Sequence, residues 1–444
     1  MLLRFLRAES RCHRLTCGIE QKEDSSYVLL FAQRNHGNGR CSLDILNRRA
    51  ALKASALIGM GAMASRSLIP TTTAAESGAN ETPPAEPVTR YGPQSATGDV
   101  AAVYQRAREV LYPICRVCPQ CDGVACAGEF PGIGGLGSGM SFQNNFTGLQ
   151  RVRLKIRPLS GNKQPDCSTT LLGQKLSFPA MAAPIGGLAV NFPKLIDISE
   201  DQYFEAIIGG CVDAGTMGSI GDLQSNPLSV TKGHYEVAGR FPGKVIAGIK
   251  PRLNENFISI VRLAEAAKAF MITIDIDSAG RGWMDASKST AVEPKTVAQL
   301  RELVRSTKIP VIVKGIMTPD DALLVGETGA AGICVSNHGG RVLDNSSSTA
   351  DALPAIADKV KGKMVILVDG CVHYGTDVLR YVALGADAVL VGRHIWRAAH
   401  GGGRQGVALF MKTMRDELTA AMVLTAVPTV AAISRNILDL DSRA

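Results

Sequence analysis

Eight short apolar runs alternate with amphipathic segments over the C-terminal two-thirds of the chain. The runs cover residues 178–184, 215–220, 244–250, 271–276, 310–316, 332–338, 365–370 and 388–393. Segments with helical spacing of apolar residues, such as 319–327 and 375–384, follow them. Apolar runs of this length indicate parallel strands covered on both faces. Eight such units predict an α/β fold of the closed (β/α)8 TIM-barrel type, and no G-x-G-x-x-G motif follows the first run.

Polar residues gather where these runs end. They are Lys250, Asp275, Lys314, the segment Ser336-Asn337-His338, Asp369 and Arg393. Barrels of this type carry their chemistry at the C-terminal ends of the strands. Each residue alone is equally well explained as a partner in a structural ion pair. Their coincidence at one rim favours a functional site.

The turns after the last two runs are rich in glycine. They read Asp369-Gly370-Cys371 and Gly392-Arg393. Backbone N–H groups approach an anion closely where side chains are absent, and barrels often hold phosphate after strands seven and eight. Arg393 adds a charge-assisted donor. These turns predict a phosphate-bearing ligand without identifying it.

The segment from Ser336 to Arg341, Ser-Asn-His-Gly-Gly-Arg, is the most specific in the chain. The imidazole of His338 can take a proton near neutral pH, and Arg341 can bind a carboxylate through two hydrogen bonds. The pair suits a substrate with a hydroxyl and a carboxylate. Lys314 would stabilise negative charge on a reduced flavin, or it pairs with a neighbouring aspartate.

These motifs resemble the FMN-dependent α-hydroxy-acid oxidases and dehydrogenases, the family of glycolate oxidase, lactate oxidase and flavin-linked lactate dehydrogenase. The resemblance runs from about residue 151 to 429. Its strongest elements are Val313-Lys314-Gly315-Ile316, residues 336–341, Ala352-Leu353-Pro354, Asp369-Gly370, residues 375–378 and 383–386, and Gly392-Arg393. It implies a TIM barrel over residues 151–436 that binds FMN.

The resemblance implies that a small 2-hydroxy acid is oxidised to a 2-oxo acid, with His338 as the base and flavin N5 as the hydride acceptor. Arg341 would bind the substrate carboxylate, and Lys314 would bind the flavin pyrimidine edge. Further flavin contacts are implied for Pro184, Ile185, Gly186, Thr273, Ser336, Asp369, Gly370, Cys371, His373, Gly392 and Arg393. Oxygen, a quinone or a cytochrome would reoxidise the flavin, and the family tends to form tetramers.

Several positions depart from the family pattern. Residues 247–251 replace a Gln-x-Tyr motif, and Gly282 stands where a second substrate arginine is usual. His373 replaces an arginine of the phosphate loop. Lys250 is the candidate for the missing positive substrate contact. Because the substrate residues differ, two alternatives stay open: a flavin-bound isomerase like type 2 isopentenyl diphosphate isomerase, and a non-catalytic flavin-binding protein.

The N-terminal 75 residues are interpreted as a leader. Residues 1–53 hold ten Lys and Arg against five Asp and Glu, which is +5 of the total net charge of +8. With no later basic stripe carrying aromatics, we expect no nucleic-acid partner. Arg48-Arg49, the small residues 54–64 and Thr73-Ala74-Ala75 resemble a twin-arginine export signal; a basic amphipathic segment is the alternative. The expected location is periplasmic, otherwise cytoplasmic, and residues 76–99 should form a disordered linker.

Four cysteines lie in the segment 100–150 that precedes the barrel, after a predicted helix at 103–111. They are Cys115, Cys118, Cys121 and Cys126. Thiolates on tight turns can bind zinc or an iron–sulfur cluster, but the spacing matches neither ferredoxin pattern. The favoured interpretation is a disulfide in an exported protein, or structural cysteines that line a loop near the active site in a cytosolic one, and a metal site is the alternative.

Overall fold

The computed structural model describes residues 16–21, 27–34, 41–45, 99–129, 133–159, 161, 163–188, 198–223, 228–284 and 292–439. They belong to two units, residues 1–88 and residues 89–444. In the first unit, β1 (Thr16–Gln21), β2 (Tyr27–Arg34) and β3 (Cys41–Ile45) pair as an antiparallel sheet in that order. The twin-arginine segment and residues 76–98 of the predicted linker lie outside the described residues.

A parallel eight-stranded sheet forms the centre of the second unit. Its strands are β7 (Ala180–Ala182), β8 (Gly218–Ile220), β9 (Val245–Ile249), β10 (Met271–Asp275), β11 (Val311–Ile316), β12 (Gly332–Val335), β13 (Val365–Val368) and β14 (Ala388–Val391). Consecutive strands pair from β8 to β14, and β14 pairs with β7. Between β7 and β8, the Ala182 amide donates to the Met217 carbonyl at 3.0 Å. The sheet therefore closes, and the predicted barrel is confirmed.

Each predicted apolar run contains one strand, but the strands are shorter than the runs. The run 332–338, for example, leaves the ladder after Val335, and its last residues turn into the short 3-10 helix η2 (His338–Gly340). The pairing with β13 also ends at Val335. The polar ends of the runs are thus turns above the sheet, where their side chains are available for a site.

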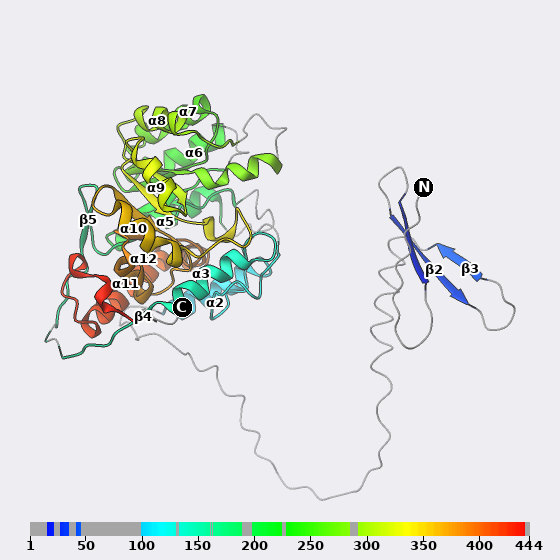
Figure 1. The fold of residues 1–444 in the computed structure, drawn as a ribbon, viewed down its shortest axis with the longest axis horizontal. Helices are drawn as coiled ribbons and strands as arrows, with labels where there is room; N and C mark the ends of the chain where they lie inside the picture. The colour runs from blue at the N-terminus through cyan, green and yellow to red at the C-terminus, as the bar shows by residue number, and fades with distance from the viewer. Residues whose placement is uncertain are drawn as a thin grey trace, which may run out of the picture. The chain divides into compact units, whose positions relative to one another are not determined.

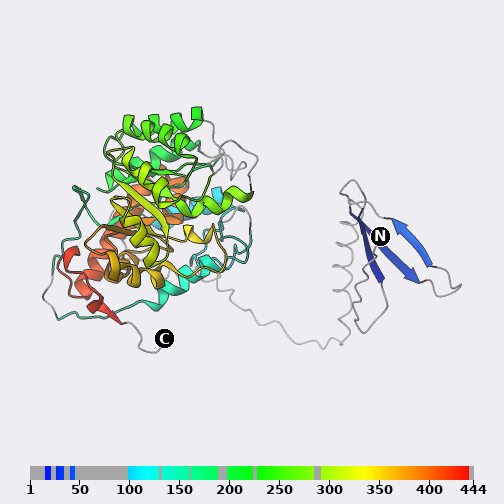
Figure 2. The ribbon, with the colours of Figure 1, turned by 45° about the horizontal axis from the view of Figure 1, so that its top comes forward.

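Helices cover the outside of the barrel, as Figures 1 and 2 show. They are α5 (Glu200–Asp213), α6 (Leu228–Ala238), α7 (Asn254–Ala266), α8 (Val297–Arg305), α9 (Pro319–Gly326), α10 (Thr349–Val360), α11 (Gly375–Leu384) and α12 (Arg393–Leu424). Side-chain caps fix several helix starts, with capping boxes at Ser199 and Thr296. None of the helices in the described ranges is long and apolar enough to cross a membrane.

Apolar side chains fill the part of the barrel interior at the N-terminal ends of the strands. One buried apolar cluster contains Met181, Met217, Ile246, Ile312, Cys334, Leu367 and Leu390 from the strands or their starts. Leu171 and Leu176 join it from a hairpin of β5 (Thr169–Leu171) and β6 (Gln174–Leu176). The hairpin therefore covers the end where the strands begin, and the polar strand ends lie at the other end.

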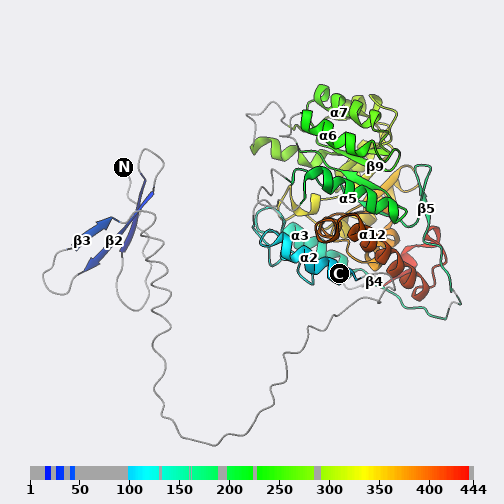
Figure 3. The same ribbon diagram turned by 180° about the vertical axis from the view of Figure 1, so that it is seen from behind.

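Two helices ahead of the barrel pack onto it: α2 (Val100–Leu111) and α3 (Met140–Arg151). The view from behind in Figure 3 shows α2 beside α12. A Cβ at Gly401 of α12 would lie 2.0 Å from the Val103 carbonyl oxygen, so glycine is required for this close approach. The chain ends in η3 (Val430–Ala432), η4 (Arg435–Ile437) and β15 (Leu438–Asp439), and β15 pairs with β4 (Arg153–Leu154).

Candidate active site

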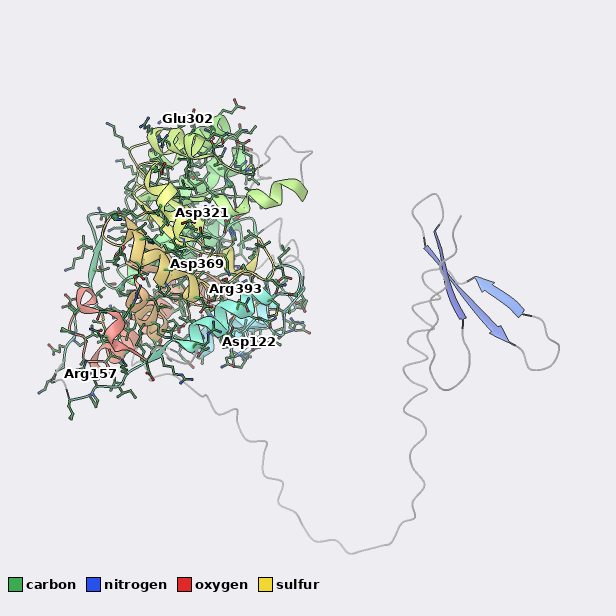
Figure 4. All side chains as sticks on the ribbon, in the orientation of Figure 1. Asp122, Arg157, Glu302, Asp321, Asp369 and Arg393 are labelled. Carbon is green, nitrogen blue, oxygen red and sulfur yellow. The ribbon has the colours of Figure 1, made fainter. Side chains whose placement is uncertain are left out.

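The C-terminal ends of the strands surround a cavity of about 910 Å³, its open mouth included. Ten of the residues predicted from the sequence line it: Pro184, Ile185, Lys314, His338, Arg341, Asp369, Gly370, Cys371, Gly392 and Arg393. In the view of Figure 4, Asp369 and Arg393 lie toward the middle of this unit, whereas Glu302 and Arg157 lie near opposite ends. The expected convergence of polar strand ends is thus present in the fold.

A strained turn holds His338 at the cavity. The φ angles of His338, Gly339 and Gly340 are 58°, 63° and 78°, in the left-handed region that a side chain disfavours. A Cβ at Gly340 would lie 2.5 Å from the backbone nitrogen of Phe142. Asn337 caps the turn by accepting from the Gly340 amide at 3.2 Å. The two glycines therefore allow α3 to pack against the turn that carries the histidine.

Two carboxylates separated by one residue act on two different groups. Asp277, in η1 (Ile276–Met284), binds His338 Nδ1 at 3.0 Å. Asp275, at the end of β10, binds the ammonium of Lys250 at 2.7 Å. A Cβ at Gly315 would lie 2.5 Å from the Cβ of Asp277, so the glycine after Lys314 makes room for the carboxylate.

The imidazole of His338 is oriented by Asp277. Because Nδ1 donates to the carboxylate, the lone pair of the neutral ring lies on Nε2. The ammonium of Lys250 lies 3.4 Å from that Nε2. The side chain of His338 is 13 % exposed, and burial together with the cations of Lys314 and Lys250 holds its pKa well below the ordinary value. The histidine is therefore neutral and able to accept a proton.

Lys314 belongs to a hydrogen-bonded chain across the next two strands. Its ammonium donates to Ser336 Oγ at 3.0 Å and lies 3.5 Å from Asp369 Oδ2. Ser336 Oγ in turn donates to Asp369 at 2.9 Å. Burial opposes the charged form of Lys314, but Asp369 and Asp275 outweigh it and hold the pKa of Lys314 above its usual value. A permanent cation therefore faces the cavity.

The glycine-rich turns form the far side of the cavity. Gly370 has φ 118°, and Cys371 follows in a left-handed conformation with φ 53°. A Cβ at Gly392 would have Ala183 as its nearest neighbour at 4.0 Å, so this turn faces open space. Arg393 donates to the carbonyls of Ile133 and Gly339, both at 2.8 Å. These contacts tie the last turn to the histidine turn.

Comparison with known proteins identifies the family. The profile of the FMN-dependent dehydrogenase family matches residues 133–300 and 284–440. A peroxisomal (S)-2-hydroxyacid oxidase of Arabidopsis thaliana is 30 % identical over 324 residues, which cover 68 % of this chain and 89 % of that protein. The chain belongs to the FMN-dependent dehydrogenase family. It is an FMN-dependent oxidoreductase on a (β/α)8 barrel.

Two further relatives of this chain support the assignment. An L-lactate dehydrogenase of Xanthomonas campestris pv. campestris is 44 % identical over 162 residues, 36 % of this chain and 41 % of the relative. A crystal structure of mandelate oxidase with (S)-2-phenylpropionate superposes with a TM-score of 0.62 at 28 % identity, over 77 % of this chain and 97 % of that one. Another mandelate oxidase structure carries an FMN adduct. These relatives do not favour the isomerase alternative.

The residues that line the cavity fit a flavin. A Cβ at Gly392 would meet no atom nearer than 4.0 Å, so the backbone of this turn is open to a phosphate group. Lys314 and Arg393 both line the cavity and supply two cations. Lys314 would hold the flavin pyrimidine edge, and the turns at Gly370 and Gly392 would hold the phosphate.

Five predicted residues are not among the described residues that line the cavity: Gly186, Thr273, Ser336, His373 and Lys250. Ser336 and Lys250 lie behind the cavity wall. Ser336 contacts Lys314, and Lys250 contacts His338, and both of these contacted residues line the cavity. His373 stacks on His394 at 3.6 Å between ring centroids, and Tyr104 Oη lies within 3.4 Å of its Nε2. Burial lowers the pKa of His373 to about 3, so it is neutral in this arrangement.

Other wall residues come from upstream of the barrel, and two of them, Phe142 and Ile133, were not predicted. Phe142 of α3 lies under the Arg393 guanidinium, 3.9 Å from the ring centroid. Ile133 and Cys121 also line the cavity. No local pattern connects them with strand ends more than 150 residues away. Asp277 was recognisable in principle, because a second carboxylate two residues after Asp275 is a further polar group beyond a strand end.

The four upstream cysteines are all free thiols. They line a second, smaller cavity of about 270 Å³ together with Arg397 of α12. In the described ranges, no group of three His, Cys, Asp or Glu side chains is arranged to hold a metal ion. Cys121 lines both this cavity and the candidate active site.

Proposed function

We propose that this enzyme oxidises a small 2-hydroxy acid to the corresponding 2-oxo acid, with His338 as the base. FMN, when bound, accepts the two electrons of the oxidation. The observation that carries the proposal is the fixed imidazole: Asp277 engages Nδ1 and leaves Nε2 as the proton acceptor, within a cavity that Arg341 also lines. The named activities of the relatives support the same reaction.

The residues divide the work as follows. Arg341 would bind the substrate carboxylate and orient the hydroxyl toward His338 Nε2. His338 would take up the substrate proton, and Asp277 would stabilise the resulting imidazolium. Lys250 does not line the cavity, but its ammonium lies 3.4 Å from Nε2, so it would act on the substrate through His338.

The test is anaerobic reduction of the FMN-loaded protein by a panel of 2-hydroxy acids, followed as loss of flavin absorbance at about 450 nm. At least one acid should bleach the flavin. The His338→Asn variant should keep FMN and lose the reaction by roughly 10²- to 10⁴-fold, the usual contribution of a general base. A protein that binds FMN but is bleached by no acid, or a variant that reacts like the wild type, would refute the assignment.

The electron acceptor and the oligomeric state are part of the same proposal. The reduced flavin would pass its electrons to oxygen, a quinone or a cytochrome, and we propose a homotetramer on the family resemblance. Mixing the anaerobically reduced enzyme with each acceptor in turn identifies the one that restores the flavin absorbance fastest. Light scattering of the purified enzyme gives the number of subunits; a monomer would contradict the tetramer.

We also propose export by the twin-arginine route. Arg48-Arg49 followed by small residues supports it, and a flavoenzyme that folds around its cofactor before transport suits this route. Replacing both arginines by lysine should retain the protein in the cytoplasm, measured by cell fractionation. Equal distribution of both forms would refute the signal.

A further inference from the structure

A buried guanidinium lies next to the active-site cavity without a carboxylate partner. Arg397 is 2 % exposed, and its Nη2 donates to Cys121 Sγ at 3.2 Å. Its Nε and Nη1 have no hydrogen-bond partner, and within the described part of the chain no carboxylate pairs with it. A buried cation that lacks an anion costs several kcal/mol. The surroundings of Arg397 should therefore provide a negative charge.

The groups that can provide it are thiolates. The cavity beside Arg397 is lined by Cys115, Cys118, Cys121 and Cys126. Cys115 lines the same small cavity as Cys121 and Arg397. An adjacent arginine stabilises a thiolate, and the thiolate is the reactive form of cysteine. The guanidinium and the two sulfurs thus share one small cavity.

The two sulfurs differ in access. Cys121 lines the active-site cavity, so a small molecule that enters the cavity can reach it. Cys115 is 2 % exposed and lines only the inner cavity. The other thiol that faces the active site, Cys371, is half-buried like Cys121, and desolvation raises its pKa well above the ordinary value. Among these thiols, Cys121 is therefore the one that both lines the cavity and accepts a hydrogen bond from a guanidinium.

We propose that Cys121 is a peroxide-reactive cysteine and that Cys115 resolves it as a disulfide. The Cys121 thiolate attacks one oxygen of hydrogen peroxide, the O–O bond breaks, and hydroxide leaves, which gives a sulfenic acid at Cys121. The Cys115 thiol then attacks this sulfur and water leaves. Two thiols are oxidised and one peroxide is reduced to two molecules of water. The reaction needs neither FMN nor a hydroxy acid, so it stands apart from the proposed oxidation.

The test uses the full-length protein, first reduced and then treated with one equivalent of hydrogen peroxide without any hydroxy acid. Peptide mapping under non-reducing conditions should find a Cys115–Cys121 disulfide. In Cys115→Ser, the sulfenic acid at Cys121 should persist and be trapped by dimedone. Cys121→Ser should abolish both products. Cys167→Ser, which removes a thiol outside the cluster, should behave like the wild type.

Arg397 is tested by a matched pair of variants. Arg397→Met should slow the oxidation of Cys121 by roughly 10-fold or more, because the thiolate loses its cation, and Arg397→Lys should retain most of the rate. Melting curves of both variants confirm that they are folded. Equal rates in wild type and Arg397→Met, oxidation of Cys371 before Cys121, or a bound metal ion that protects the four thiols would each overturn the proposal.

Discussion

The ammonium of Lys250 lies 3.4 Å from Nε2 of His338, on the opposite side of the imidazole from the carboxylate of Asp277. This cation contributes to the lowered pKa of His338, after burial and Lys314. The base works only when neutral, so a lowered pKa keeps it active toward acidic pH. Removing the cation should move the loss of activity to higher pH.

We therefore expect Lys250→Met to shift the acidic limb of the pH profile upward. The unpaired Asp275 carboxylate acts in the same direction, because it favours imidazolium. The measurement is the rate constant for anaerobic flavin reduction at subsaturating substrate, across pH. Lys361→Met is the matched control, since Lys361 forms a partly exposed ion pair with Asp387 and neither residue lines the cavity. An unmoved limb in Lys250→Met would contradict the role of this cation.

We expect Asp277 to contribute mainly to the catalytic rate and Asp275 mainly to the stability of the fold. Asp277→Asn should lower kcat by roughly 10²-fold or more, because the amide no longer stabilises the imidazolium. Asp275→Asn should cost roughly 3–5 kcal/mol of unfolding free energy, because it leaves the Lys250 ammonium buried beside a neutral group. Stopped-flow kinetics and urea titration measure the two effects. Loss of stability without loss of rate in Asp277→Asn would reverse the assignment.

Gly340 and Gly362 have the same left-handed backbone conformation, but an added Cβ would clash with another residue only at Gly340. Their φ angles are 78° and 79°, but a Cβ at Gly340 would lie 2.5 Å from the Phe142 nitrogen, and a Cβ at Gly362 would meet nothing within 4 Å. Both alanine variants should lose about 1–2 kcal/mol from the left-handed backbone. Gly340→Ala should lose a further ~1–3 kcal/mol from overpacking. Urea unfolding gives both values; equal losses would mean that α3 moves away freely.

The sequence allowed the barrel to be predicted because its signals are local. Each strand is an apolar run, and the polar residues that end the runs, such as Lys314 and His338, must converge when parallel strands close. The strand lengths were overestimated because composition does not show where the ladder stops. At β12 it stops at Val335, where the chain turns to present His338. That turn depends on packing against α3.

The missed parts of the site depend on contacts between distant segments. The cation–π contact of Phe142 with Arg393 joins α3 to the end of β14. His373 stacks on His394 and does not line the cavity, and no spacing in the sequence predicts this contact. Lys250 was predicted as a positive substrate contact, but its pairing with Asp275 required the register of β9 beside β10. Such relationships arise from tertiary packing, which periodicity does not encode.

Glu417 of α12 should make the stability of the enzyme depend on pH. Burial raises its pKa from 4.5 to about 7, although it accepts a hydrogen bond from the Gly375 amide at 2.8 Å. Because the folded-state pKa is above the unfolded one, the stabilising contribution of the protonated carboxyl is complete below pH 4.5 and is lost as the pH rises to about 7. The loss amounts to at most about 3 kcal/mol.

The variant Glu417→Gln keeps the hydrogen-bond acceptor and cannot titrate. Its unfolding free energy should therefore lose the pH dependence that the Glu417 carboxyl causes. Relative to it, the wild type should become less stable between pH 5 and pH 8, measured by urea titration at both values. Glu255→Gln, at an exposed position on α7, is the matched control and should keep the wild-type slope. The prediction is wrong if the unfolding free energies of the wild type and Glu417→Gln change by the same amount between pH 5 and pH 8. In that case the Glu417 carboxyl has the same pKa in the folded and unfolded states.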